Sequence, residues 1–480
     1  MPRRQIRLAA ADGEDVRAGF ARIRAELDIP DGFPGAVEES ARQAAAAAAA
    51  AVVRNAHVDR TDLPFVTIDP PDSLDLDQAL HIERRGSGYR VHYAIADAAT
   101  FVEPLGDLDQ ETHRRGVTLY APDRRTPLHP ETLCEGAASL LPGVDRPALL
   151  WTMDLDSTGE GTAVEVSRAV VRSRAKLDYP SVQRSLDSGN ADGVLPLLRE
   201  VGRLREERER ERGGVNLPSP DRVVVQQGSG WTLEFRAPLR VEGWNAQMSL
   251  MCGMAAAQLM LYGEIGILRT LPPADARDLA RLRRSAQALR VPWSDETSYA
   301  AFIRALDPAE PTHAALLASS TVLLRGAGYT SFEGGVPEQP LHAALASEYA
   351  HVTAPLRRLV DRYAAEICVA LCSDQEVPEW VRAALDVLPK EMADADRRAH
   401  QYERAIIDLV EAALLRPHVG EIFMGTVTEV DQTSAKGTVQ LRDPAVEASV
   451  AGQDLPLGQQ VELRLVEADV QRRKVHFELA

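Results

Sequence analysis

The chain reads Phe65-Val-Thr-Ile-Asp69-Pro-Pro-Asp72-Ser-Leu-Asp75-Leu-Asp77-Gln78-Ala-Leu80 where a β-rich apolar run gives way to a cluster of four carboxylates. Carboxylates held a few Å apart repel one another unless they are splayed into water or share a cation. Mg²⁺ and Mn²⁺ are hard cations that suit oxygen ligands. We interpret the segment as a metal site, and a solvated acidic turn is the alternative that the segment alone leaves open.

The spacing of the acids allows three of them to face one pocket. Asp75 and Asp77 are two residues apart, so their side chains point to the same side of an extended segment. The Pro70-Pro71 pair would turn the chain so that Asp69 returns toward them. A calcium-binding EF-hand loop is disfavoured because Pro71 stands where that loop needs an oxygen ligand.

Length and composition indicate a multi-domain globular protein. The chain has 480 residues, of which 45% are hydrophobic and 26% charged, so it can bury several cores. The first residues lack the apolar region of a secretion signal, and no apolar run is long enough to span a membrane, so we expect a cytoplasmic protein. The four cysteines show neither zinc-site nor disulfide spacing and are expected to be buried.

The net charge of −17 argues against binding nucleic acid over the whole outer surface. A local basic channel remains possible, because basic residues gather in a few places. Taken singly, each of these clusters is expected to be a solvated face. The clusters are Arg124-Arg125, Arg168 to Lys176, Arg357-Arg358 and Arg472-Arg473-Lys474.

Periodicity divides the chain into three regions: a helical region before the acids, an α+β middle and a β-rich end. Residues 14–57 read as helical, with a turn between Pro30 and Pro34 and an alanine run from Ala44 to Ala51. Strands are expected at 79–82, 89–95, 148–154 and 163–171, and helices at 190–211, 243–265, 274–290, 312–325, 358–373 and 390–414.

The region from Gly420 to Phe477 alternates short strands and turns, which is typical of a small five-stranded barrel. Phe423, Phe477 and the basic tract Arg472-Arg473-Lys474 have the chemistry that OB barrels use to stack on bases and contact phosphates. These residues would therefore suit stacking and phosphate contacts with a single strand, although such a barrel is stable without a ligand.

Four segments in this order resemble the ribonuclease II / ribonuclease R (RNB) family of exoribonucleases. They are Thr67 to Leu80, Val91 to Asp97, Arg115 to Tyr120 and Tyr349 to Arg358. The resemblance implies a multi-domain α+β fold: an N-terminal helical region (1–58), an RNB catalytic domain in which helices wrap a mixed sheet (59–415), and a C-terminal OB-fold barrel of the ribosomal-protein type (416–480). Residues before position 65 are too few for the two further OB barrels of better-known members.

The resemblance implies an activity and a set of site residues. The activity is processive 3′-to-5′ hydrolysis of single-stranded RNA to nucleoside 5′-monophosphates in RNA turnover, with Mg²⁺ or Mn²⁺ as cofactor, by a protein we expect to be a monomer. Asp69, Asp75 and Asp77, with Gln78, would hold the metal and position water. Arg357 would contact the scissile phosphate, and Tyr120, Glu403 and Arg358 would bind substrate. A core tyrosine and a surface glutamate are the alternatives for Tyr120 and Glu403.

Two departures from the family pattern bear on activity. Gln78 stands where the family carries a fourth aspartate, and its amide oxygen can bind a metal without adding charge. Leu217 stands where members often place an aromatic residue opposite the tyrosine. An RNA-binding protein of this fold, weakened in catalysis by Gln78, is therefore the alternative function, and a DNA-directed phosphodiesterase is a third possibility that the sequence cannot test.

Overall fold

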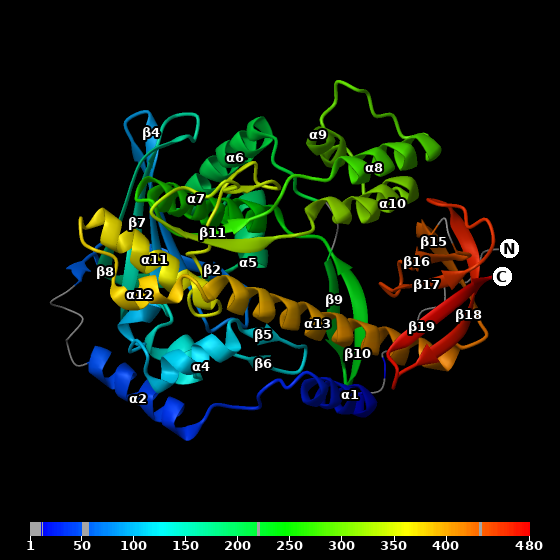
Figure 1. Ribbon diagram of the computed structural model, residues 1–480, viewed down its shortest axis with the longest axis horizontal. Coiled ribbons are helices and arrows are strands. Elements are labelled where there is room, and N and C mark those ends of the chain that lie inside the picture. Colours follow the sequence, from blue (N-terminus) through cyan, green and yellow to red (C-terminus); the bar gives the residue numbers. More distant parts are fainter. Residues whose placement is uncertain (1–10, 12, 50–56, 218–220, 432–433) are drawn as a thin grey trace.

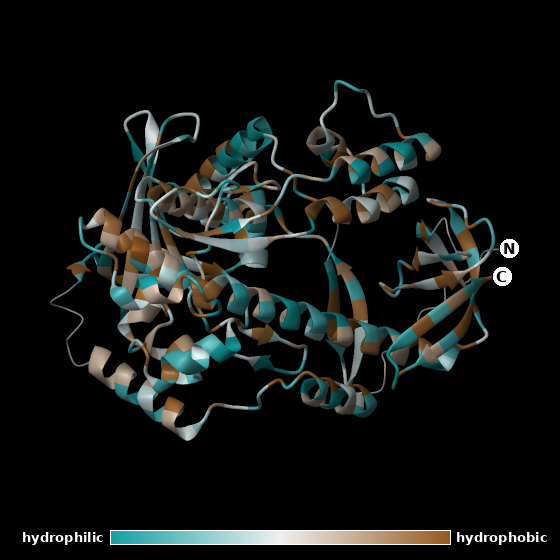
Figure 2. Cartoon of the chain, in the orientation of Figure 1, coloured by the Kyte–Doolittle hydropathy of each residue, from teal (hydrophilic) through white to brown (hydrophobic). Residues whose placement is uncertain are grey.

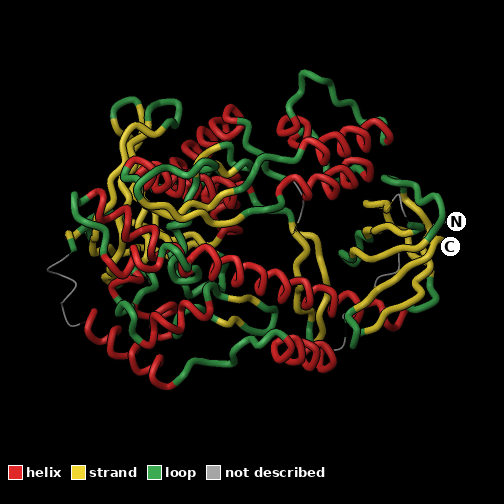
Figure 3. Tube along the Cα trace, in the orientation of Figure 1, coloured by secondary structure: helices red, strands yellow, loops and turns green. Residues whose placement is uncertain are grey.

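The computed structural model describes residue 11 and residues 13–49, 57–217, 221–431 and 434–480. It shows an α+β body joined by one long helix to a barrel at the opposite end of the molecule (Figure 1). Helices surround the strands of the body, whereas strands and loops alone form the barrel (Figure 3). This arrangement confirms the expected fold class.

The central sheet of the body has the strand order β1-β8-β2-β3-β4-β7, and β8 also pairs with β7. The long strand β8 pairs with β7 through its first two thirds and with β2 through its last residues, so the strand order returns on itself. The bounds are β1 Val58–Asp59, β2 Phe65–Asp69, β3 Gln78–Arg85, β4 Gly88–Ala96, β7 Asp145–Leu155 and β8 Gly161–Asp178.

The acidic segment is the connection between two neighbouring antiparallel strands. Strand β2 ends at Asp69 and β3 begins at Gln78, so both ends of the connection are fixed by the sheet. The intervening residues are irregular rather than extended in a strand, because Pro70 and Pro71 prevent continuation of the ladder. The acids therefore lie at one end of two interior strands of the sheet.

Helices cover the sheet, and the predicted ones are present with shifted ends. Helix α7 is buried over most of its circumference, as its apolar sequence predicts (Figure 2). The helices of the body are α4 Asp107–Arg115, α5 Tyr179–Asp187, α6 Leu195–Arg212, α7 Arg240–Tyr262, α8 Ala276–Ala288, α9 Tyr299–Arg304, α10 Pro311–Ser320, α11 Leu359–Cys372, α12 Glu379–Ala384 and α13 Leu388–Leu415.

Four two-stranded antiparallel sheets complete the body; three are hairpins, and in the fourth β11 and β12 are separated in the sequence by α8, α9 and α10. The hairpin of β9 and β10 was not predicted, although its Gly228-Ser-Gly230 turn lies between runs of strand-forming residues. The strands are β5 Leu119–Tyr120 with β6 Arg125–Thr126, β9 Asp221–Gln227 with β10 Gly230–Arg236, β11 Ile265–Thr270 with β12 Gly328–Glu333, and β13 Leu341–His342 with β14 Ser347–Glu348.

The N-terminal region contributes two helices, α1 (Gly13–Glu26) and α2 (Gly35–Ala49). Helix α1 packs on α13 so closely that a Cβ added at Gly19 would lie 2.5 Å from a methyl carbon of Leu409. Residues 50–56, which the sequence assigns to the same helical region, lie outside the described residues. Within the described ranges, no helix combines the length and apolar composition that crossing a bilayer requires.

The C-terminal barrel closes in the order β15-β16-β17-β19-β18, which confirms the five predicted strands. Its strands are β15 Ile422–Asp431, β16 Lys436–Gln440, β17 Glu447–Ala451, β18 Gln460–Asp469 and β19 Lys474–Leu479.

The prediction that Phe423 and Phe477 are placed to stack on bases is wrong. Phe423 and Phe477 lie in the barrel core, where their rings meet edge to face at 5.8 Å. Strand alternation places a phenylalanine inside or outside with equal ease, and here both rings are needed to fill the core. The residues of the basic tract are also engaged in ion pairs: Arg472 and Lys474 share Glu467, and Arg473 pairs with Glu26.

Candidate active site

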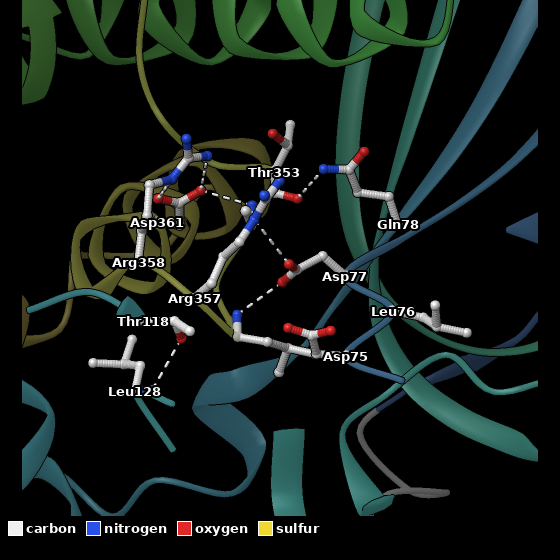
Figure 4. Close-up of polar contacts among 12 residues, drawn as sticks. Asp75, Leu76, Asp77, Gln78, Thr118, Leu128, Thr353, Arg357, Arg358 and Asp361 are labelled. Carbon is white, nitrogen blue, oxygen red and sulfur yellow. Dashed lines mark hydrogen bonds and ion pairs between the residues drawn. The ribbon is translucent and has the colours of Figure 1, made fainter. Parts of the chain in front are cut away.

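The acidic segment meets the loop that precedes α11, and Asp77 is the point of contact (Figure 4). The carboxylate is only 5% exposed. It accepts a hydrogen bond of 2.8 Å from the backbone N–H of Leu356. Its other oxygen lies 3.4 Å from Nε of Arg357. Two segments far apart in the sequence therefore build one charged centre.

Asp361, in the first turn of α11, holds this loop in shape. Its buried carboxylate accepts the N–H of Ala354 at 2.7 Å and a two-pronged contact from Arg358 at 2.8 and 2.7 Å. The guanidinium of Arg358, expected to bind substrate, is thus bound to a neighbouring acid. This geometry favours a role for Arg358 in fixing the loop.

The strand-like residues 116–118 hold the backbone on the other side of Arg357. The carbonyl of Arg357 accepts the N–H of Thr118 at 2.9 Å, and Gly116 accepts the N–H of Leu359 at 2.9 Å. Gly116 has a φ of +70°, and a Cβ there would lie 2.4 Å from that of Ala395. The Arg357 side chain leaves this fixed backbone 46% exposed, so its donors remain accessible.

Tyr120 and Asp75 lie beside this centre. The Tyr120 hydroxyl is 3.5 Å from Asp75, and its side chain is 49% exposed, so it is not a core tyrosine. Asp75 also pairs with Arg125 at 2.6 Å, and Arg125 contacts Glu135 through its other nitrogen. Arg125 is a site residue that the sequence showed only as part of a basic pair. Its position across the hairpin from Tyr120 could have drawn attention to it.

Gln78 is engaged at both ends of its amide. Its nitrogen donates to the carbonyl of Thr353 at 2.7 Å, and its oxygen accepts the hydroxyl of Tyr93. The Thr353 hydroxyl in turn is 2.7 Å from that of Ser249 on α7. Gln78 therefore links β3 to the arginine loop. This arrangement favours a positioning role over the ligand role that the family pattern suggests for its position.

Burial gives the acids unusual protonation properties. Burial raises the pKa of Asp69 to about 6, with Asp75 adding to the rise and Arg357 opposing it. Burial likewise raises the pKa of Asp77 to about 7, against the opposing effects of Arg357 and the Leu356 N–H. Carboxyls that resist ionisation in this way are stabilised as anions by a nearby cation.

The donor set fits a hard divalent cation by its chemistry. Asp75 lies close enough to Asp69 and to Asp77 to affect each of them electrostatically, and all three acids supply oxygen. Among the described residues, no three His, Cys, Asp or Glu side chains already converge as a metal cage. Asp75 is turned instead toward Arg125, so metal binding would compete with that ion pair.

Two further sequence candidates lie away from the acids. Glu403 is exposed on α13, and no hydrogen bond or ion pair joins it to the acidic centre within the described ranges, so its role stays a prediction. Leu217 packs on the cluster formed by α8, α9 and α10. Arg168, from another basic cluster, is paired with Asp97 and Glu366 and has a structural role.

Family comparison matches two parts of the chain. The RNB domain matches residues 57–374, and the RNase II-type exonuclease C-terminal S1 domain matches residues 421–480. Ribonuclease R of Escherichia coli K12 is 27% identical over 510 residues, covering 94% of this chain and 61% of the relative. The human exosome complex exonuclease RRP44 is 28% identical, covering 67% of this chain and 35% of the relative. The chain thus spans about three fifths of the E. coli relative's length.

Solved structures share the fold. The apo form of Mycoplasma genitalium RNase R has a TM-score of 0.86 at 19% identity, covering 97% of this chain and 78% of that one. Yeast Ssd1, described as a pseudonuclease, has a TM-score of 0.69 at 18% identity, covering 86% of this chain and 52% of that one. Because the RNB domain match covers more than half of its residues, this chain belongs to the RNB-domain family.

Proposed function

We propose that this chain is a processive exoribonuclease that hydrolyses single-stranded RNA from its 3′ end to nucleoside 5′-monophosphates. The observation that supports this most is the contact of Asp77 with Leu356 N–H and Arg357, which joins an acidic segment to a phosphate-binding group. A site for phosphodiester hydrolysis needs such a pairing, because the attacking water and the developing phosphate charge must both be stabilised.

We assign each of the site residues one task. When bound, Mg²⁺ or Mn²⁺ would activate the water and offset phosphate charge, with Asp69, Asp75 and Asp77 as the residues that hold it. Arg357 presents a fork of N–H donors to the scissile phosphate. Tyr120 offers an exposed ring on which the terminal base stacks. Gln78, Arg358 and Asp361 keep the arginine loop in register with the acids.

RNA as the substrate is supported by relatives and by the chemistry of the site. The same fold has been solved with single-stranded, ribose-methylated RNA in Mycoplasma genitalium RNase R. The chain carries a net charge of −17, so RNA would be held mainly within the site and its approaches.

A second candidate function is RNA binding without turnover. It is favoured by Gln78, which replaces a negative charge, and by the likeness of the fold to the pseudonuclease Ssd1. Retention of Asp69, Asp75 and Asp77 together with Arg357, which contacts Asp77 directly, supports the hydrolase instead.

Incubation with 5′-labelled RNA and a matched DNA oligomer, in Mg²⁺, Mn²⁺ or EDTA, separates the candidates. We expect stepwise shortening of RNA from the 3′ end that EDTA abolishes. RNA that is bound but never shortened in either metal would support the binding protein, and equal cleavage of DNA would contradict an RNA-specific site.

A further inference from the structure

Helix α1 contacts the turn of the hairpin that carries Tyr120. One nitrogen of Arg24, in the last turn of α1, lies 3.0 Å from each carboxylate oxygen of Asp123. Asp123 lies in the loop between β5 and β6, and the two side chains are only 12% and 17% exposed. A pair this well shielded is screened less by salt than an ordinary surface pair.

The linker after α1 adds two more contacts to the same hairpin. Asp31 forms an ion pair with Arg124, which follows Asp123 in the turn. Arg115 donates to the carbonyl of Gly32 in the linker at 2.5 Å and to that of Pro127, just after β6, at 3.0 Å. The turn and base of the hairpin are therefore both attached to residues 13–34, which we call the N-terminal brace.

The hairpin needs such support. Strands β5 and β6 have only two residues each, and a two-stranded hairpin alone is marginally stable in water. Yet it carries two side chains of the site, Tyr120 and Arg125, as directly paired residues. A small rotation of the hairpin would displace the tyrosine ring and the partner of Asp75 together.

The N-terminal brace is itself anchored elsewhere. Glu26, in the same helical turn as Arg24, pairs with Arg473 of the barrel at 2.6 Å. Phe20 packs edge to face on Trp231 of β10 at 5.6 Å. Near its start, Asp15 pairs with Arg416 at 2.8 Å. Helix α1 thus connects the barrel and the β9–β10 hairpin to the hairpin of Tyr120 (Figure 1).

We propose that the N-terminal brace positions Tyr120 for the 3′-terminal base and so sets how firmly the enzyme holds short RNA ends. The inference rests on the proposed function, in which Tyr120 stacks on that base. Arg24 and Asp123 are positioning residues, since neither touches the acids. Loosening the brace would weaken the grip on the terminal base and leave the chemistry at Asp77 and Arg357 intact.

The test compares Arg24→Ala with Arg22→Ala, which removes the same charge from an exposed position on the same helix. The probe is a short RNA with a fluorescent base analogue at its 3′ end, whose quenching reports stacking and is measured in EDTA without turnover. For Arg24→Ala we expect weaker quenching, affinity lower by about fivefold, and a similar rise in KM with kcat changed less than about twofold. Arg22→Ala should match the unsubstituted protein.

Two further variants identify the route of the effect. The charge swap Arg24→Asp with Asp123→Arg should restore quenching and KM, which general destabilisation would not do. In a Tyr120→Ala background, Arg24→Ala should have no further effect, because coupled residues are not additive.

Unchanged quenching and KM in Arg24→Ala would overturn the proposal, as would an equal loss in the Tyr120→Ala background. If the unsubstituted protein quenched the probe but never hydrolysed RNA, the proposed activity would fail while the N-terminal brace could still be judged by quenching. If the protein hydrolyses RNA and Arg24→Ala changes neither quenching nor KM, the proposed role of the N-terminal brace is refuted while the proposed activity stands.

Discussion

The acidic centre, formed by Asp69, Asp75 and Asp77, and the C-terminal barrel differ in how far their charged groups are balanced by partners. In the barrel, a hydrogen bond from Lys474 lowers the pKa of Glu467, and Arg472 adds a second partner. In the acidic centre, burial raises the pKa of Asp77 to about 7 even though Arg357 stands beside it. The barrel is electrostatically satisfied as it stands, whereas the acidic centre is not.

This difference supports the proposal that the acidic centre, and not the barrel, is the catalytic part of the molecule. A domain gains stability by pairing its charges, so acids left buried and under-neutralised indicate a function that offsets their cost. The barrel buries Phe423 and Phe477 in its core and pairs its basic tract, so neither marks an RNA site. The predictions below test this contrast, beginning with the acids.

The largest effect is expected for Asp77→Asn. The amide keeps the shape of the side chain but removes the charge that the proposed site uses, so hydrolysis of RNA should fall by about a thousandfold or more. Thermal unfolding should show a fold at least as stable, because a buried charge is removed. Asp72→Asn, at an exposed position in the same segment, is the matched control and should retain full activity.

Arg357→Lys should reduce kcat by about a hundredfold, because a point charge cannot replace a fork of donors on the phosphate. Single-turnover rates with saturating RNA measure this loss. An unchanged single-turnover rate would show that Arg357 only offsets the charge of Asp77.

Tyr120→Ala should weaken binding of a short RNA by about tenfold, since one base loses its stacking partner. The shortest RNA left undigested should also change in length, which a sequencing gel measures. If binding and end product were both unchanged, the exposed tyrosine would have no part in holding the RNA end.

Gln78→Ala distinguishes positioning from metal ligation. The loss of the hydrogen bonds to Thr353 and Tyr93 should lower kcat by about fivefold. The Mg²⁺ concentration that gives half-maximal activity should stay the same. A large increase in that concentration would instead identify Gln78 as a ligand, as the family pattern suggests.

The smallest effect concerns Glu411, the buried acid of α13 that joins the barrel to the body. It accepts the backbone N–H of Glu447 at 2.9 Å and pairs with Arg222, while burial raises its pKa to about 8. The folded form keeps the proton where the unfolded form has lost it, so stability should fall as the pH rises toward 8. In Glu411→Gln, the fall in melting temperature as the pH rises toward 8 should be smaller by about 1–2 °C. The control Glu478→Gln, at an exposed position, should show the same fall as the unsubstituted protein.

Local pattern and family motifs together predicted the residues of the candidate site better than the contacts that hold those residues in place. The acidic segment, Tyr120 and Arg357 were identified because their order matches a family, and the structure brings Asp77 and Arg357 together. The two hydrogen bonds of the Gln78 amide were not predictable, because its partners Thr353 and Tyr93 come close to it only in the folded protein.

The barrel and the N-terminal region show where pattern reasoning fails. Alternation located the five strands but could not tell that Phe423 and Phe477 point inward, since either face satisfies a period of two. The ion pairs of Arg24 with Asp123 and of Glu26 with Arg473 join residues distant in the sequence, and surface charges carry no signal of their partners.

The most direct test of the central claim is the mass of the mononucleotide released from single-stranded RNA in heavy-oxygen water with Mg²⁺. Hydrolysis at the proposed centre predicts a nucleoside 5′-monophosphate that carries one heavy oxygen on its phosphate, absent with Asp77→Asn. A cyclic or 3′-phosphorylated product, or bound RNA with no mononucleotide, would contradict the assignment of the acids and Arg357 to metal-assisted hydrolysis.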